Sequence, residues 1–161
     1  MNKGFSLIEM VVAVGVFAVV ITISLAAFLN ISDIQKRTEA LRAINDNLNF
    51  SLETMMREIR SDSNYRVGSG GTSLTISNES GNDISYRLNN GRIEMAAGGS
   101  SYVALTAPEV NITKLLFMVQ GQASGDGLQP RVTIIITGSA GEKKTINLNL
   151  QTTVSQRKID S

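Results

Sequence analysis

The chain of 161 residues contains no cysteine, no histidine and no tryptophan. Without histidine it lacks the commonest general base and metal ligand, and without cysteine it can form neither disulfides nor reactive thiols. The formal charge is only +1, with acidic and basic residues intermixed, so no basic face of the kind that binds nucleic acid is evident. We therefore expect neither an enzyme nor a nucleic-acid-binding protein, and the sequence indicates no cofactor and no metal.

Proline and glycine are scarce in the first part of the chain. No proline precedes Pro108, and Gly15 is the only glycine between residues 5 and 60. Charge is missing from residues 10–29, a run of 20 almost entirely apolar residues. As a helix this run would be about 30 Å long, which matches the hydrocarbon core of a bilayer. Secretory signal peptides have shorter apolar regions of about 7–15 residues, so we expect a retained membrane-spanning helix.

Helical periodicity continues beyond the apolar run, to about Arg60. Apolar residues recur at helical spacing on one face: Ile34, Leu41, Ile44, Leu48, Leu52, Met55 and Ile59. Opposite charges lie four positions apart on the other face: Asp33 with Arg37, Arg42 with Asp46 and Glu53 with Arg57. The pattern predicts one continuous helix, membrane-spanning over residues 5–29 and amphipathic over residues 30–62. A coiled coil is the alternative interpretation of the apolar stripe.

Residues 63–161 alternate short β-rich runs with glycine-rich turns, which is typical of antiparallel sheet. We expect one hairpin that turns at Asn90-Gly91, between ISYRL and RIEMA, and a second that turns at SAGE, between RVTIIITG and KKTINLNLQTTV. Lys143 and Lys144 fall in the second turn, where positive charge would guard an edge strand. Further strands are predicted at TSLTIS, YVALT and ITKLLFMVQ. Because so much sheet needs a covering layer, we predict an α+β fold in which the sheet packs against the amphipathic half of the helix.

Glu9 stands directly in front of the apolar run. A charged side chain near hydrocarbon costs about 3 kcal/mol or more, so such a residue is a functional-site hypothesis by default. Ser6 and Glu9 also match the S-x-x-E capping box, and a carboxylate in the first turn of a helix is favoured by the helix dipole. A local cap is therefore a second interpretation of Glu9, although it does not account for the residues that precede it.

The opening residues KGFSLIEMVVAVGVFAVV resemble the amino terminus of type IV prepilins and of the pseudopilins of type II secretion. Members of these families have a short basic leader ending in glycine, then phenylalanine, then a glutamate five residues into the mature chain, and then a long apolar helix. The corresponding residues here are Lys3, Gly4, Phe5 and Glu9. NFSLETMMREIR and LNLQTTVSQR look like stretches of minor pilins and J-type pseudopilins. The lack of an early proline and of cysteine also fits a minor pilin or a pseudopilin.

The resemblance implies a processing and assembly scheme. Prepilin peptidase would remove residues 1–4 by cutting between Gly4 and Phe5, and would methylate the new amine of Phe5. The subunit would wait in the cytoplasmic membrane, surrounded by lipid with its β-rich domain outside, until machinery driven by a cytoplasmic ATPase moved it into a filament of pilin or pseudopilin subunits. Glu9 would then neutralise the buried amine of a neighbouring Phe5 and fix the axial register between subunits.

Three functional classes are compatible with the sequence. The favoured one is a structural subunit, in a minor position, of a type IV pilus or pilus-like filament. The second is a type II secretion pseudopilin, which shares every feature used above. The third is a signal-anchored membrane protein with an extracytoplasmic binding domain, which would retain residues 1–4 in the mature protein.

Two clusters in the β-rich part have ordinary interpretations. Oxygen-bearing side chains gather in SNESGNDIS and could in principle hold calcium: Asn78, Glu79, Asn82 and Asp83, with Asp126 in another loop. Their spacing does not match an EF-hand, and such clusters are normally turns, so we interpret them as turns. Arg157 and Lys158 form a small basic end that we interpret as a solvated tail.

Overall fold

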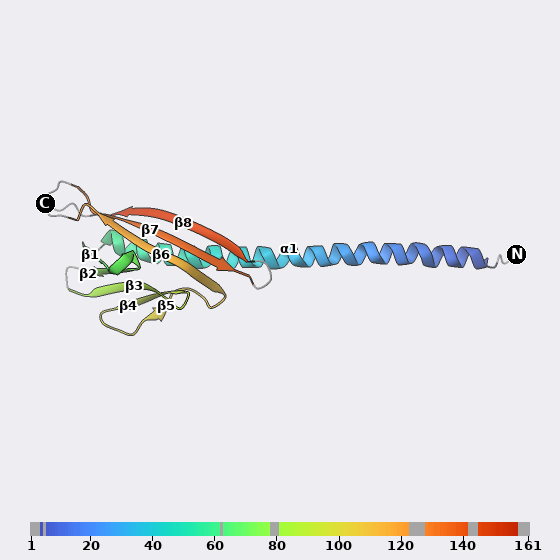
Figure 1. Ribbon diagram of the computed structural model, residues 1–161, viewed down its shortest axis with the longest axis horizontal. Helices are drawn as coiled ribbons and strands as arrows, with labels where there is room; N and C mark the ends of the chain where they lie inside the picture. Colours follow the sequence, from blue (N-terminus) through green and yellow to red (C-terminus); the bar gives the residue numbers. More distant parts are fainter. Residues whose placement is uncertain are drawn as a thin grey trace. The chain divides into compact units, whose positions relative to one another are not determined.

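A computed structural model describes the chain at residues 4, 6–61, 63–77, 81–122, 128–141 and 145–157. The chain divides into two compact units, Met1–Thr38 and Glu39–Ser161. A single α-helix, α1 (Leu7–Ser61), contributes to both units, as Figure 1 shows in blue and cyan. The predicted continuous helix is therefore confirmed, and it ends within one residue of the predicted end.

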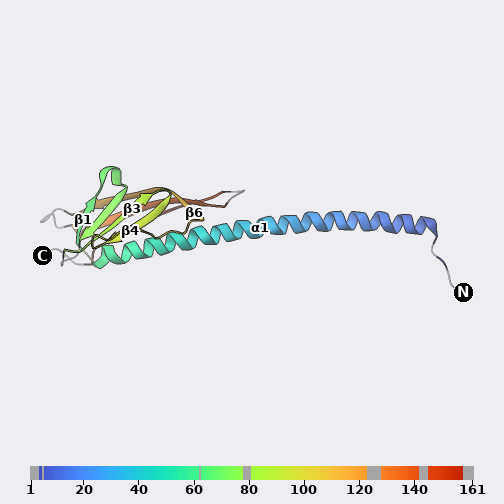
Figure 2. The same ribbon diagram turned by 90° about the horizontal axis from the view of Figure 1, so that it is seen from below.

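The second unit contains two antiparallel sheets. The first has the strand order β1-β2-β3-β4-β5, with β1 (Ser63–Val67), β2 (Ser73–Ser77), β3 (Asp83–Asn89), β4 (Arg92–Ala97) and β5 (Val103–Ala104). The second has the order β6-β7-β8, with β6 (Val110–Gln120), β7 (Arg131–Ala140) and β8 (Ile146–Ser155). A short 3-10 helix, η1 (Ser69–Gly71), follows β1. Within this unit both sheets lie on the same side of α1 (Figure 2). The sequence predicted antiparallel sheet correctly, but not its division in two.

One apolar core joins α1 to both sheets. The helix contributes five apolar side chains that are at most 6% exposed: Ile44, Leu48, Leu52, Met55 and Ile59. They cluster with side chains such as Tyr86 of the first sheet and Phe117 of the second. For these five the predicted apolar stripe is confirmed. Ile34 and Leu41 were predicted on the same stripe but are 63% and 47% exposed, so burial of the stripe does not extend to them. Periodicity identifies an apolar face and not how far along the helix a partner covers it.

The predicted hairpins are both present. Asn90 and Gly91 connect β3 to β4 with φ angles of 47° and 73°, as the type I′ turn of a two-residue hairpin requires. β7 pairs with β8 in the second hairpin, whose turn residues 142–144 lie outside the described residues. YVALT contributes only the two-residue β5. β1 was not predicted, because its register with β2 is interrupted after Ser63 and it has few apolar residues to signal a strand.

Three polar contacts join α1 to β1 and to the segments next to β6 and β8. The Tyr65 hydroxyl donates to the Ile59 carbonyl at 2.6 Å, and the Arg157 N–H donates to the Arg60 carbonyl at 3.2 Å. Both satisfy carbonyls in the last turn of α1, which have no partner within the helix. Farther up the helix, Asn47 Oδ1 accepts a hydrogen bond of 2.7 Å from the Ala107 N–H. These contacts fix the sheets against α1 at both ends of the core.

We expect Asn47→Ala to lower the free energy of unfolding by about 1–2 kcal/mol, because the half-buried Ala107 N–H loses its acceptor. The measurement is denaturant unfolding of the detergent-solubilised chain. Asn45→Ala is the matched control, since Asn45 lies on the same helix and is exposed. Equal losses for the two variants would contradict a specific role for Asn47.

Candidate functional site

Glu9 lies in the first turn of α1 with an exposed side chain. The Ser6 hydroxyl oxygen accepts a hydrogen bond of 3.3 Å from the Glu9 N–H, so Ser6 caps the helix. Only this half of the capping box forms: among the described residues, nothing makes a hydrogen bond or ion pair with the Glu9 carboxylate. Gly4 is exposed as well, whereas Phe5 lies outside the described residues. Glu9 thus offers a free carboxylate at the start of the helix.

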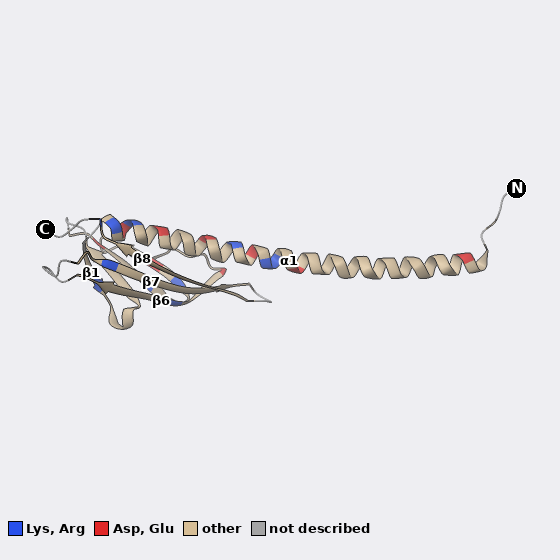
Figure 3. Ribbon diagram, turned by 90° about the horizontal axis from the view of Figure 1, so that it is seen from above, with Lys and Arg blue, Asp and Glu red and all other residues tan. Residues whose placement is uncertain are grey.

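The helix that follows is apolar on every side. Its large apolar side chains between Leu7 and Leu29 are 40–83% exposed. This segment is the one candidate membrane span found in the described residues, with a mean hydropathy of 2.7 over 18 residues and none of that window buried. In Figure 3, α1 is red near its start and then carries neither red nor blue until its second half. Such a surface requires a cover, and none of the residues that the structure describes provides one.

The polar side chains inside the apolar segment are satisfied within the helix. The Thr22 hydroxyl donates to the Ala18 carbonyl and the Ser24 hydroxyl donates to the Val20 carbonyl, both at 2.8 Å. Hydroxyls that bond back to their own helix in this way need no partner from water. The segment can therefore be transferred into lipid or into a protein interior with Glu9 as its one costly group.

Two acidic residues of the first sheet, Asp83 and Glu94, are engaged by neighbouring side chains. The Ser77 hydroxyl donates to Asp83 Oδ1 at 2.6 Å and is the main cause that lowers the pKa of Asp83; partial desolvation opposes it, and the ion pair with Arg66 adds to it. Arg87 Nε donates to Glu94 at 2.8 Å and lowers the pKa of that carboxyl.

Arg87 also takes part in a second contact, since its guanidinium lies 3.6 Å from the centre of the Tyr102 ring. Together with Asn89, which donates to Glu94 at 3.1 Å, it forms a cross-strand network on β3 and β4. Within the described ranges the only ion pairs are Arg66 with Asp83 and Arg87 with Glu94. The three ion pairs predicted along α1 are not among them. The network stabilises the sheet and brings no reactive group into a cleft.

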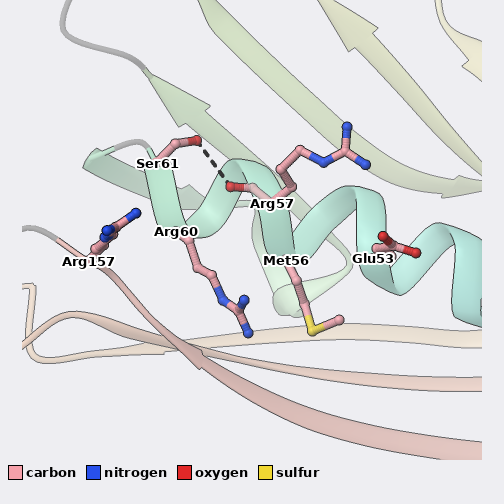
Figure 4. Close-up of a pocket in the computed structure, with 6 residues that line it drawn as sticks. All are labelled: Glu53, Met56, Arg57, Arg60, Ser61 and Arg157. Carbon is pink, nitrogen blue, oxygen red and sulfur yellow. Dashed lines mark hydrogen bonds between the residues drawn. The ribbon is translucent and has the colours of Figure 1, made fainter.

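A pocket of about 380 Å³ lies at the end of α1, lined by Glu53, Met56, Arg57, Arg60, Ser61 and Arg157 (Figure 4). The side chains of Arg57 and Arg60 point to different sides of the helix in Figure 4 and do not converge on one point. The Ser61 hydroxyl donates to the Arg57 carbonyl at 3.1 Å. Cations at this end of a helix offset the negative end of its dipole, which accounts for the arginines without a ligand.

The predicted turn cluster around SNESGNDIS is only partly described. Asp83 is bound to Ser77 and Arg66, and Gly81 has a φ of 77°, as in a turn. Asn78, Glu79 and Asp126 lie outside the described residues. No three acidic, histidine or cysteine side chains come together as metal ligands in the part of the chain that can be assessed.

Two known families match the chain. Residues 1–25, which include Gly4, Phe5 and Glu9, match the prokaryotic N-terminal methylation motif, so the chain begins like a type IV prepilin. Residues 34–156 match the family described as prepilin peptidase-dependent protein B, and the chain belongs to this family. No curated protein and no solved structure matches the chain significantly. The chain is accordingly a pilin or pseudopilin subunit, and its partners include prepilin peptidase and other pilin-like subunits.

The lowered pKa values of Asp83 and Glu94 predict acid sensitivity of the second unit. Both carboxyls have ordinary pKa values when unfolded, so the unfolded state binds protons at a higher pH than the folded state. Their contribution to stability is therefore complete above about pH 5 and is lost as the pH falls through their folded pKa values. Melting temperatures between about pH 6 and pH 3 measure this loss.

We expect the melting temperature of Asp83→Asn to fall less steeply toward acid pH than that of the wild-type chain, because the substituted side chain no longer titrates. Glu109→Gln is the control, since Glu109 is exposed and has no hydrogen-bond or ion-pair partner among the described residues. A decline that is equally steep in the wild-type chain and in Asp83→Asn would contradict the role assigned to the Ser77 and Arg66 contacts.

Proposed function

We propose that the chain is a minor structural subunit of a type IV pilus or pilus-like filament. In this proposal residues 1–4 are a leader that prepilin peptidase removes, and residues 5–29 are first a membrane anchor and later part of the filament core. Residues 30–62 form the amphipathic half of the helix. Residues 63–161 form the domain on the outer side of the cytoplasmic membrane. A cytoplasmic ATPase drives assembly without contacting this domain.

The observation that carries the proposal is the apolar surface of α1 between Leu7 and Leu29. A helix that is apolar on all sides is stable only inside lipid or among other apolar helices. Before assembly, lipid supplies this cover, and in a filament the helices of neighbouring subunits supply it. A soluble binding protein would have no use for this surface.

Glu9 has a specific task in this scheme. Cleavage after Gly4 would create a positively charged amine on Phe5, and methylation would leave that charge in place. In a filament core the amine is tolerable only when an opposite charge is paired with it. Glu9 lies four residues away along the chain, and no described residue engages its carboxylate. It can therefore pair with the amine of an adjacent subunit and set the axial register.

The type II secretion pseudopilin is the second candidate, and the absence of proline before Pro108 and of cysteine fits it equally well. The genes next to this one distinguish the two, since pilus and secretion operons encode different companions. A signal-anchored membrane protein is the third candidate, and it requires the mature protein to retain residues 1–4.

The substitution Glu9→Gln tests the proposal. The glutamine preserves size, and the Ser6 cap uses only the Glu9 backbone N–H, so the helix should still begin normally. The neighbouring amine would lose its counter-charge, and we expect the amount in sheared filaments to fall by about a hundredfold or more. The protein should still be cleaved and should accumulate in the membrane.

Glu39→Gln is the matched control, because Glu39 is an exposed acidic residue on the same helix outside the apolar segment. It should enter filaments at the wild-type level. Recovery of Glu9→Gln from filaments at that same level would reduce Glu9 to a local cap and would overturn the proposed docking role.

A further inference from the structure

β8 is an edge strand of unusual composition. It ends the order β6-β7-β8, and its sequence INLNLQTTVS contains no charged residue, no glycine and no proline over ten residues. It pairs with β7 from Ile146 to Ser155 without a bulge or register shift. Proteins normally protect exposed edges with charge, proline, bulges or short strands, because an open edge pairs readily with another strand.

The remaining sheet edges are protected in these ways. β1 has five residues with an interrupted register, and β5 has two. β6 has a register shift after Ile112, whose N–H is bonded to the Gly91 carbonyl at 2.8 Å. Gly71 of η1 lies so close to the β6 backbone that a Cβ there would be 3.0 Å from the Phe117 carbonyl oxygen. Among the described strands, only β8 presents a long, regular and uncharged edge.

The hydrogen-bond pattern identifies which backbone groups face outward. The Gln156 N–H donates to the Pro130 carbonyl at 2.9 Å, so the adjacent pair of Ser155 and Arg131 is a non-hydrogen-bonded pair. The two kinds of pair alternate along an antiparallel ladder. The N–H and C=O groups that point away from β7 therefore belong to Asn147, Asn149, Gln151, Thr153 and Ser155.

Two observations support this assignment. The hydroxyls of Thr133 and Thr153 lie 2.9 Å apart, as expected for directly opposed side chains of a closely spaced non-hydrogen-bonded pair. Over the described ranges, no hydrogen bond outside the ladder reaches the outward backbone groups of β8. Five donors and five acceptors thus line an edge about 33 Å long.

The inward side of β8 is incompletely covered as well. Leu148 and Leu150 are half-buried, whereas Ile134 and Ile136 of the central strand β7 are fully buried. A further strand beside β8 would cover these leucines while it satisfied the outward N–H and C=O groups.

We propose that the free edge of β8 docks an extended strand of a different pilin-like subunit, which becomes the fourth strand of this sheet. The nature of the partner rests on the function proposed above, whereas the edge itself is a property of the fold. The sequence has Lys143 and Lys144 before the strand and Arg157 and Lys158 after it. Pairing β8 with its own copy would bring basic ends together in either direction, so these charges favour a partner strand with acidic flanks over a second copy.

Disulfide crosslinking in cells tests the pairing directly, because the chain has no cysteine of its own. The full chain carries one cysteine, at Asn149 or at Gln151, and each other pilin-like protein of the cell carries one at successive positions of its strands. We expect crosslinks at alternate partner positions, and a shift of the strongest position by two residues when the cysteine moves from Asn149 to Gln151. A helical spacing of three or four residues, or no crosslink to any pilin-like partner, would overturn the proposal, and so would crosslinking between copies alone.

Gln151→Pro and Gln151→Ala distinguish the contribution of the Gln151 backbone N–H to docking from the contribution of its side chain. The proline removes an outward N–H without breaking a bond to β7, whereas the alanine leaves the edge intact. We expect the proline to reduce the crosslink from Asn149→Cys by about tenfold or more, and the alanine to change it by less than about twofold. Equal crosslinking in the two variants would overturn the proposal. If the proline impairs folding, the cysteine scan still tests the proposal, because it uses neither variant.

Strand docking at β8 and incorporation into a filament can be measured separately. Crosslinks can be read in the membrane fraction even if the chain never enters a filament. Conversely, filament incorporation at the wild-type level with no crosslink would leave the filament function standing and remove β8 as a docking surface.

Discussion

The apolar surface of α1 must be covered along its length, and the rest of the structure depends on this constraint. From Ile44 to Ile59 the two sheets provide the cover, and polar contacts of Asn47, Tyr65 and Arg157 hold this part of the chain to the helix. From Leu7 to Leu29 the described chain provides none. One helix therefore belongs to a folded domain at one end and depends on other molecules at the other.

This dependence explains why polar groups are distributed as they are. Thr22 and Ser24 bond to their own helix, so they place no demand on the surroundings. Glu9 is different, since its backbone N–H is bonded to Ser6 while no described residue engages its carboxylate. A free carboxylate at the start of an otherwise apolar segment is costly in isolation, and it becomes tolerable when the surroundings supply a cation. The function proposed here supplies that cation from Phe5 of another subunit.

Local patterns made much of the fold predictable, whereas long-range pairing was beyond them. The extent of α1 and the turn at Asn90-Gly91 follow from spacing and from turn chemistry. The division into two sheets, the bond between Asn47 and Ala107 and the open edge of β8 depend on contacts between distant residues. Likewise the motif around Gly4 and Glu9 was recognisable from the sequence, whereas the lack of a partner for the Glu9 carboxylate among the described residues depends on the folded chain.

The most direct test of the account is the mass of the amino-terminal peptide of the wild-type chain recovered from sheared filaments. The account predicts a peptide that begins at Phe5 and carries one additional methyl group. A peptide that begins at Met1, or a processed chain that is found in the membrane and never in the filament fraction, would contradict it.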